Sequence, residues 1–476
     1  MIKDISDQTQ LKEKHIWGYG LGNFGYGIIF QIMATYFVFY ATAVLGLSGT
    51  LVGLIIGIGV VWDAVSDPMM GYISDFTISK KFGRRHLYLW VGGISMVITN
   101  LVLWNLNPNM PDWLLLVIMA LMLLLIKTAT TIYGTPYSAL GAEMTHDHAE
   151  RTKVQSVRMG FFMLGIFFAT AGGMLVFFRS TPAYPMGQLN PMGYQIMGIV
   201  TSIIVLGTSL ISIFSTQHLI PKLNLRVVEN SNAGIKNFFK LLFDAYRHDD
   251  LRAVVIGYLF TNLAAALLSN IGLLVYTYTF KMHNTDIAII AGGQLLVAVL
   301  SQPFWLWRNK HQDKIVSIRQ GLMLSMTASV YFVGCVFLQK YVAINLWVLT
   351  PFVLLAGFGS GGLFTLPQAM VADAVDENAL NTGTRQEGVY YGTLTLTYKL
   401  SQSVAILMIG ILVDFLGFDS KLSTQSLFTT TSLGLLLSLG SLLAFIFAFF
   451  SYQKYKITRK RLHEIHEGLL ARDKTL

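Results

Sequence analysis

Cysteine and charged residues are both scarce in this sequence. One cysteine, Cys335, stands among 476 residues, so an intrachain disulfide is excluded. Charged residues make up 12% of the chain, against about 25% in a typical soluble globular protein, whereas hydrophobic residues make up 54%. This imbalance excludes an ordinary cytosolic enzyme and indicates that the apolar residues face lipid.

Signals that would mark a secreted protein or an enzyme are also missing. The first residues, MIKDISDQTQLKEKH, are polar and of mixed charge, so we expect no removable signal peptide. The sequence shows no Ser/His/Asp constellation, metal-ligand cluster or cofactor fingerprint. We therefore expect a protein that is not an enzyme and that carries neither a metal nor an organic cofactor.

The sequence does contain a series of apolar runs, each long enough, at roughly 20 residues, to cross a bilayer as a helix. We expect twelve spans, at residues 16–45, 50–74, 86–105, 113–140, 155–178, 194–214, 253–281, 285–305, 315–338, 343–372, 386–416 and 426–452. The predicted fold class is an all-α membrane protein. Its expected segments are an N-terminal six-helix half (1–215), a central linker (216–252), a C-terminal six-helix half (253–452) and a basic tail (453–476).

The distribution of lysine and arginine predicts the orientation. With the N-terminus inside, nearly all of these residues outside the spans fall on the inner side, and the exceptions are Arg179, Lys281, Lys340 and Lys421. Cytoplasmic loops retain Lys and Arg, so both termini are predicted to be cytoplasmic, in the plasma (inner) membrane. The same rule explains the net charge of +9, and we expect no nucleic-acid partner.

The second span carries two acids on one face. Asp63 and Asp67 are four residues apart and Ser66 is three from Asp63, so the three oxygen-bearing side chains share a helix face. Two stacked carboxylates repel each other, and a bound cation or a proton on one of them relieves the repulsion. Pro68 is expected to kink this helix and free a carbonyl. The alternative is that both acids pair with basic residues on other helices.

Six spans, a linker and six more spans are the layout of the major facilitator fold. Gly71, Asp75 and the Gly83-Arg84-Arg85 run between the second and third spans resemble the signature loop of that superfamily. The resemblance implies that Asp75 accepts hydrogen bonds at a neighbouring helix end while the two arginines hold the inner face. The alternative is an ordinary positive-inside loop.

Two motifs narrow the resemblance to the glycoside-pentoside-hexuronide cation symporters, the family of melibiose permease. They are WDAVSDPMMG in the second span and VADAVDENALNTGTRQEGVYYGTLTLTYKL near the eleventh. By position, the resemblance implies a cation site formed by Asp63, Ser66, Asp67 and Thr131. It also implies that Arg158 and Lys399 lie near this site and link the cation to the sugar.

This sequence departs from the family pattern at two positions. Where the resemblance implies acidic residues that bind the hydroxyl groups of the sugar, this sequence has Gly27 and Gly134. Lys127 shares a helix face with Thr131 and Gly134, the face that the resemblance places toward the central cavity. Two lost carboxylates and one added ammonium favour an anionic substrate group, such as a carboxylate or sulfonate. The alternative is that Lys127 pairs with an acid or reaches a polar rim. Tyr26 is a further candidate substrate contact, although aromatic residues in a bundle also serve as packing.

Charged residues near the end of the tenth span and the start of the eleventh form a candidate gate. They are Asp373, Asp376, Arg385 and Glu387, together with Asp75, Arg84 and Arg85 across the second loop. Ion pairs that form only when the inner side is shut would act as a gate. A merely solvated loop is the alternative.

Together these features predict a secondary active transporter that works by alternating access. We expect symport of a sugar or glycoside, including an anionic one such as a hexuronide or a sulfonated sugar, driven by Na⁺ or H⁺. The expected partners are this small-molecule substrate and membrane lipid, and the expected state is a monomer. The rival hypothesis is a transporter of lysolipid or another amphiphile, since relatives of the fold move lysolipids.

Overall fold

The computed structural model describes residues 11–77, 79, 82–145, 148–221, 246–382, 387–419, 422 and 424–473. Every regular element in these residues is a helix, and twelve helices are long and apolar enough to cross a membrane. The predicted number of spans is therefore confirmed. The side chains of Pro68, Asp75 and Glu387, and all of Arg385, lie outside what the structure describes.

The long helices follow the expected apolar runs. They are α1 (Glu13–Phe39), α2 (Gly49–Phe76), α3 (His86–Trp104), α4 (Asp112–Glu143), α5 (His148–Phe167), α7 (Pro191–Thr216), α10 (Asp249–Leu274), α11 (Asn284–His311), α12 (Lys314–Leu338), α13 (Leu346–Thr382), α14 (Glu387–Phe415) and α15 (Leu427–Tyr452). Two shorter ones are α6 (Gly173–Val176), which continues the α5 span, and α16 (Arg459–Asp473), which follows the last span.

Contacts divide the chain into two units. The first unit consists of Met1–Met33, Val61–Phe177 and Pro191–Ser231, and the second of Ala34–Val60, Phe178–Asn190 and Asn232–Leu476. The boundaries therefore cut through α1 and α2, so the second part of α1 and the first part of α2 pack with later helices of the chain.

Within the first unit, α3 packs against both α4 and α7. A Cβ added at Gly92 of α3 would lie 2.6 Å from the backbone nitrogen of Tyr133 in α4, so only glycine permits this approach. This close contact fixes how far α4 is shifted along its axis relative to α3. It thereby positions the polar residues of α4 described below.

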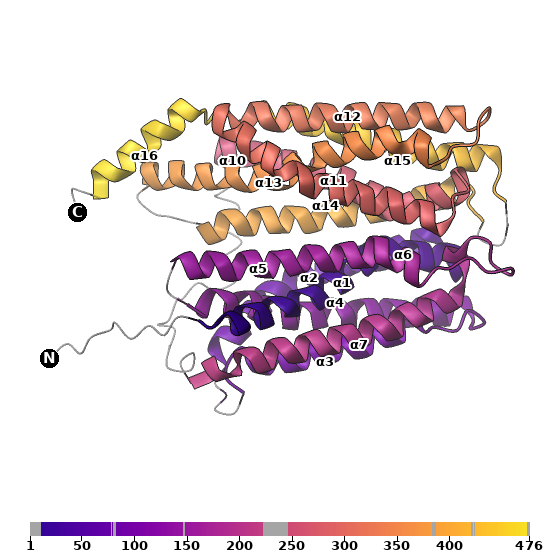
Figure 1. The fold of residues 1–476 in the computed structure, drawn as a ribbon, viewed down its shortest axis with the longest axis horizontal. Coiled ribbons are helices and arrows are strands. Elements are labelled where there is room, and N and C mark those ends of the chain that lie inside the picture. The colour runs from indigo at the N-terminus through magenta and orange to yellow at the C-terminus, as the bar shows by residue number, and fades with distance from the viewer. Residues whose placement is uncertain are drawn as a thin grey trace. The chain divides into compact units, whose positions relative to one another are not determined.

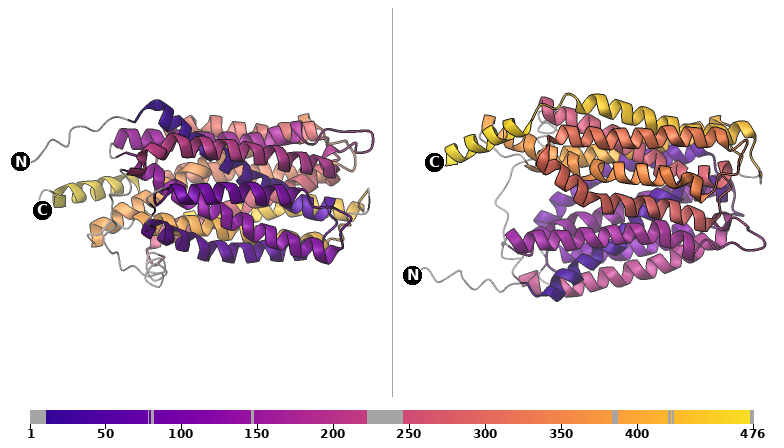
Figure 2. Two further views of the ribbon diagram at one scale, coloured as in Figure 1. Left: turned by 90° about the horizontal axis from the view of Figure 1, so that it is seen from below. Right: turned by 45° about the horizontal axis from the view of Figure 1, so that its top comes forward.

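Within the second unit, α13 packs against α11 and α12, while α10 packs against α14 and α15 (Figure 1). The core between these helices is a cluster of buried apolar side chains that includes Leu322, Met370 and Phe445. The tail helix α16, yellow in Figure 2, lies against the end of α13. Ile465 is its fully buried anchor.

The first and seventh spans end in the same way. Each finishes in five residues of π-helix, Tyr40–Val44 and Val275–Thr279. In both, a backbone N–H two residues beyond the capping residue returns to the second π-residue, from Leu47 to Ala41 and from Met282 to Tyr276, at 2.9 Å. The residue before each donor has a left-handed backbone, with φ of 74° at Gly46 and 54° at Lys281.

Lys281→Gly is expected to stabilise the protein by about 0.5–1 kcal/mol. An L-residue in the left-handed region is strained, and the equivalent position in the first span is already glycine. The Lys281 side chain is exposed, so its loss removes little packing. Denaturant unfolding in detergent would measure the gain, and Lys281→Ala, which keeps the strain, should show none of it.

Candidate functional site

Two rungs of polar contacts join α2 to α4 in the first unit. Asp63 Oδ2 lies 2.5 Å from Lys127 Nζ, and Asp67 Oδ1 accepts a hydrogen bond from Thr131 Oγ1 at 2.6 Å. Since both pairs are spaced i, i+4, the rungs are one helical turn apart on each helix. Asp63 and Thr131 are each only 7% exposed, so each rung has one buried partner.

The face between these rungs carries one unsatisfied hydroxyl. Ser66 Oγ is buried, and no described residue forms a hydrogen bond with it. Buried hydroxyls in proteins are normally bonded. Ser66 therefore offers a spare oxygen beside Asp63 and Asp67, as expected for a site that accommodates a small cation.

Lys127 points to an acid in this structure. Its ammonium neutralises Asp63, which is the alternative that the sequence had left open beside a substrate role. The side chains of Lys127 and Asp63 are 22% and 11% exposed, so the pair lies in a region of reduced dielectric. Removing one partner would leave the other charge buried without its counter-charge.

Tyr26 and Phe162 fill the space beside the two glycines that replace the family's acids. A Cβ added at Gly134 would lie 3.0 Å from the Tyr26 hydroxyl, and one added at Gly27 would lie 2.6 Å from the Phe162 carbonyl oxygen. An aspartate at either position would therefore displace an aromatic residue. Tyr26 also stacks on Tyr133, with ring centroids 6.4 Å apart, so it packs the bundle as well as facing the site.

Arg158 of α5 connects three helices of the first unit. Its Nη1 donates to Ser138 Oγ of α4 at 3.0 Å, and its carbonyl accepts from Asn23 Nδ2 of α1 at 3.0 Å. Arg158 lies close enough to Tyr26 to interact electrostatically with it, as do Asp63 and Asp67. Within the first unit the structure thus brings together the predicted cation-site residues with Tyr26, Lys127 and Arg158. Lys399 lies half-buried on α14 of the second unit.

Comparison with known proteins decides the family. A family model described as "MFS/sugar transport protein" matches residues 18–459, nearly the whole chain. The chain belongs to this sugar-transport family of the major facilitator superfamily. The resemblance to melibiose-permease-like symporters that the two motifs carry is confirmed by relatives that are themselves symporters.

The relatives of this family member are symporters of low identity that match over nearly their full length. The chain is 24% identical to the inner membrane symporter YicJ of Escherichia coli (strain K12), covering 98% of this chain and 96% of that one. It is 22% identical to the sodium-dependent lysophosphatidylcholine symporter 1-A of Danio rerio, over 97% and 89% of the two chains. It is thus similar to transporters rather than to enzymes.

Solved structures of other transporters share the fold. The nucleoside transporter NupG superposes with a TM-score of 0.61 at 15% identity, covering 94% of this chain and all of NupG. A bacterial homolog of the human lysosomal transporter Spinster gives a TM-score of 0.67 at 11% identity, covering 93% and 96%. At such identities the likeness concerns the fold alone.

In this transporter the arginine pair of the signature loop meets an acid that no sequence motif singles out. Arg84 Nη2 and Arg85 Nη2 lie 2.8 and 2.6 Å from Glu143 Oε1, at the end of α4. Arg85 Nη1 also donates to Ser74 Oγ of α2 at 2.7 Å. The only feature of the sequence that could have indicated a role for Glu143 is its position, just past the end of the fourth span.

Glu143→Gln is expected to lower the free energy of unfolding by about 3 kcal/mol, because it removes the negative charge that two buried guanidinium groups contact. Thermal unfolding in detergent would show the loss. Asp112→Asn, at the exposed opposite end of α4, is the matched control and should unfold like the wild type. Equal stability of the two variants would mean that the loop arginines are held by other groups.

Two predicted gate acids of the second unit, Asp373 and Asp376, contact the chain's own C-terminal segment. Asp373 Oδ1 lies 2.5 Å from Lys314 Nζ, and its Oδ2 accepts from the Tyr455 hydroxyl at 2.9 Å. Asp376 lies 3.3 Å from His466 of α16. Burial, together with the nearby charge of Asp373, raises the pKa of Tyr455, so its hydroxyl stays a donor.

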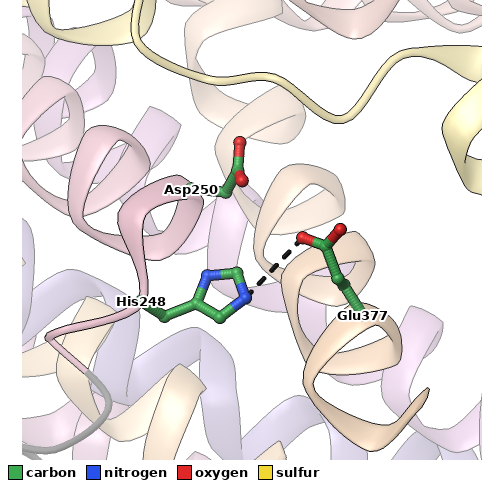
Figure 3. A group of neighbouring side chains, drawn as sticks. All are labelled: His248, Asp250 and Glu377. Atoms are coloured by element: carbon green, nitrogen blue, oxygen red, sulfur yellow. Dashed lines mark ion pairs between the residues drawn. The ribbon is translucent and has the colours of Figure 1, made fainter. Parts of the chain in front are cut away.

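His248, Asp250 and Glu377 lie together at the same end of the second unit (Figure 3). Each of the three side chains already has a partner within the chain. His248 Nδ1 accepts from the Leu251 N–H, so neutral His248 carries its proton on Nε2, which faces Glu377 Oε2 at 3.6 Å. The two acids are engaged by the tail, Asp250 by the Lys456 N–H and Glu377 by Arg461. The group anchors the tail.

Proposed function

We propose that the protein is a cation-coupled symporter for a sugar or glycoside, in which two six-helix halves alternate access to a site near the membrane midplane. Both termini are cytoplasmic in this proposal. The observation that carries it is the pair of rungs between α2 and α4, where two carboxylates lie one turn apart beside a spare hydroxyl. Buried acids of this kind in a span mark an ion pathway.

The residues divide into three roles in this proposal. The cation site is formed by Asp63, Ser66, Asp67 and Thr131, and the substrate contacts by Tyr26, Lys127, Arg158 and Lys399. The cytoplasmic gate uses Asp75, Arg84, Arg85, Asp373, Asp376, Arg385 and Glu387. The protein works as a monomer, and the coupling ion is Na⁺ or H⁺.

The charges of the site favour a substrate with an anionic group. Lys127 pairs with Asp63, and the formal charges of Asp63, Asp67, Lys127 and Arg158 sum to zero before anything binds. A neutral site in low dielectric accepts a cation and an anionic substrate together more readily than a cation alone. Gly27 and Gly134 carry no carboxylate, and neighbouring residues occupy the space beside them. This argues against a galactoside that is bound through carboxylates at these positions.

Lysolipid transport is the second candidate. Support for it comes from the similarity to the sodium-dependent lysophosphatidylcholine symporter over 97% of this chain. Arg158 or Lys127 would then receive the phosphate of the headgroup. The charged and hydroxyl-bearing side chains of the two rungs favour a compact polar substrate instead.

Transport in proteoliposomes tests the proposal directly. Uptake of neutral glycosides, hexuronides, sulfonated sugars and lysophosphatidylcholine is measured under an imposed proton gradient, a sodium gradient or neither. We expect gradient-dependent accumulation of a glycoside, strongest for one with an anionic group. Accumulation of lysophosphatidylcholine alone would favour the second candidate. If neutral sugars alone are carried, and Lys127→Ala transports them normally, the anionic-substrate hypothesis is wrong.

A further inference from the structure

The rung between Asp63 and Lys127 bears on the identity of the coupling ion, a question that rests on the proposed function. A carboxylate pair can bind sodium only if its oxygens are free to coordinate it, because hard cations take several oxygen ligands at once. Here Asp63 Oδ2 already holds an ammonium at 2.5 Å. The first oxygen of the site is therefore occupied by a cation that belongs to the protein.

A sodium ion on the same carboxylate would lie close to this ammonium. Two unit charges about 4 Å apart in a partly buried protein environment repel strongly enough to weaken binding by a factor on the order of 10² to 10³. The ion pair with Asp63 locates the Lys127 ammonium, one turn before Thr131, which forms the other rung. The ammonium therefore remains beside the site whenever the two rungs are formed.

Asp67 offers different chemistry. Its Oδ1 accepts a hydrogen bond from the neutral hydroxyl of Thr131 at 2.6 Å. A proton on Asp67 needs no coordination shell, and the Thr131 hydroxyl can turn from donor to acceptor to receive it. With that proton bound, Asp63, Asp67 and Lys127 together carry no net charge.

We propose that Lys127 is a tethered counter-cation that fills the Asp63 side of the cation site, excludes sodium and leaves Asp67 to carry a proton. Among the described residues of the first unit, Lys127 on α4 contacts Asp63, and Tyr26 on α1 interacts electrostatically with Asp63, Asp67 and Arg158 of α5. Tyr26 and Arg158 lie on helices other than those of the rungs. The exclusion of sodium therefore depends on Lys127, whose ammonium contacts a carboxylate of the pair directly, at 2.5 Å.

Sodium binding to the purified protein tests this without any substrate. Thermal unfolding in detergent is recorded in NaCl and in choline chloride at equal ionic strength, since a ligand that binds the folded state raises the melting temperature. We expect no sodium-specific rise in the wild type or in Lys127→Arg, which keeps the charge. Lys127→Met should gain a saturable rise, with sodium affinity at least a hundredfold above that of the wild type. Adding Asp67→Asn to Lys127→Met should remove it.

Two results of this binding measurement would overturn the inference. One is a sodium-specific rise in the wild type that Asp67→Asn abolishes, and the other is a folded Lys127→Met that gains no rise. If Lys127→Met does not fold, Lys127→Gln takes its place, and the wild-type measurement decides in either case. Failure of the proposed function would look different, as no glycoside would accumulate under any gradient. Sodium-driven accumulation by the wild type would keep that function and overturn this inference.

Discussion

Asp67→Asn is expected to abolish accumulation of the glycoside against its gradient while leaving exchange of that glycoside across the membrane. The amide oxygen of the substituted side chain can still accept the hydrogen bond from Thr131, so the rung and the helix packing persist. The variant loses an oxygen that can alternate between charged and protonated forms. Because linkage is reciprocal, a site that no longer binds and releases its cation cannot couple the gradient to the substrate.

Two assays on the same proteoliposomes measure this separation. Gradient-driven accumulation should fall at least a hundredfold, whereas counterflow, in which internal unlabelled glycoside exchanges for external label, should stay within a few-fold of the wild type. A simple folding defect would reduce both. Undiminished accumulation by Asp67→Asn would remove Asp67 from the coupling step.

Asp63→Asn is harder to interpret than Asp67→Asn, because Asp63 forms an ion pair with Lys127. It would leave the Lys127 ammonium buried without a compensating charge, at a cost of about 3–5 kcal/mol. The double variant Asp63→Asn/Lys127→Met removes both charges and should recover most of that stability. The comparison separates the structural role of the rung from its role in coupling.

The spans could be predicted from the sequence because the bilayer imposes a simple rule. A segment that crosses lipid must satisfy its backbone internally and must be apolar over about 20 residues, so hydropathy alone locates it. The shared face of Asp63, Ser66 and Asp67 was predictable for a similar reason, since helical periodicity acts within one segment. Both predictions depend on local information only.

Contacts between helices could not be predicted in the same way. Helical periodicity within one span does not say which residues of α2 lie opposite which residues of α4. From the sequence, Lys127 could face a substrate or an acid, and the structure shows that it pairs with Asp63. Glu143 was missed because its partners, Arg84 and Arg85, are more than fifty residues away in the chain. Asp373 was predicted as a gate residue, but its partner Tyr455 was not, because Tyr455 belongs to a tail segment far along the chain.

Gly410→Ala is expected to have the other large effect, because α14 and α2 cross in the second unit with almost no space between their backbones. A Cβ at Gly410 would lie 2.2 Å from the Gly49 carbonyl oxygen, and backbone cannot yield cheaply. One turn further along, Asp414 accepts hydrogen bonds from Ser48 Oγ and the Gly49 and Thr50 N–H groups, at 2.6 to 2.8 Å. The two helices therefore touch through glycines at the crossing, and the Asp414 carboxylate caps the start of α2 beside it.

One added methyl group should hold this crossing open. Overpacking commonly costs about 1–3 kcal/mol, and a clash with a backbone oxygen lies at or above the upper end of that range. At about 3 kcal/mol the closed crossing becomes more than a hundredfold rarer. Under alternating access a transporter must form each closed state once per cycle, so glycoside uptake should fall at least tenfold.

A buried cysteine reports the opening independently of transport. Ile56 is 5% exposed and lies seven residues after Gly49 on the same face of α2, so Ile56→Cys in a Cys335→Ala background should react slowly with a polar maleimide. Gly410→Ala should accelerate this labelling at least tenfold. Gly57→Ala is the matched control, because a Cβ there has nothing within 4 Å and should change neither labelling nor uptake. Fast labelling with normal uptake in Gly410→Ala would show that transport does not need this contact, whereas slow labelling would show that the added methyl group does not open the crossing.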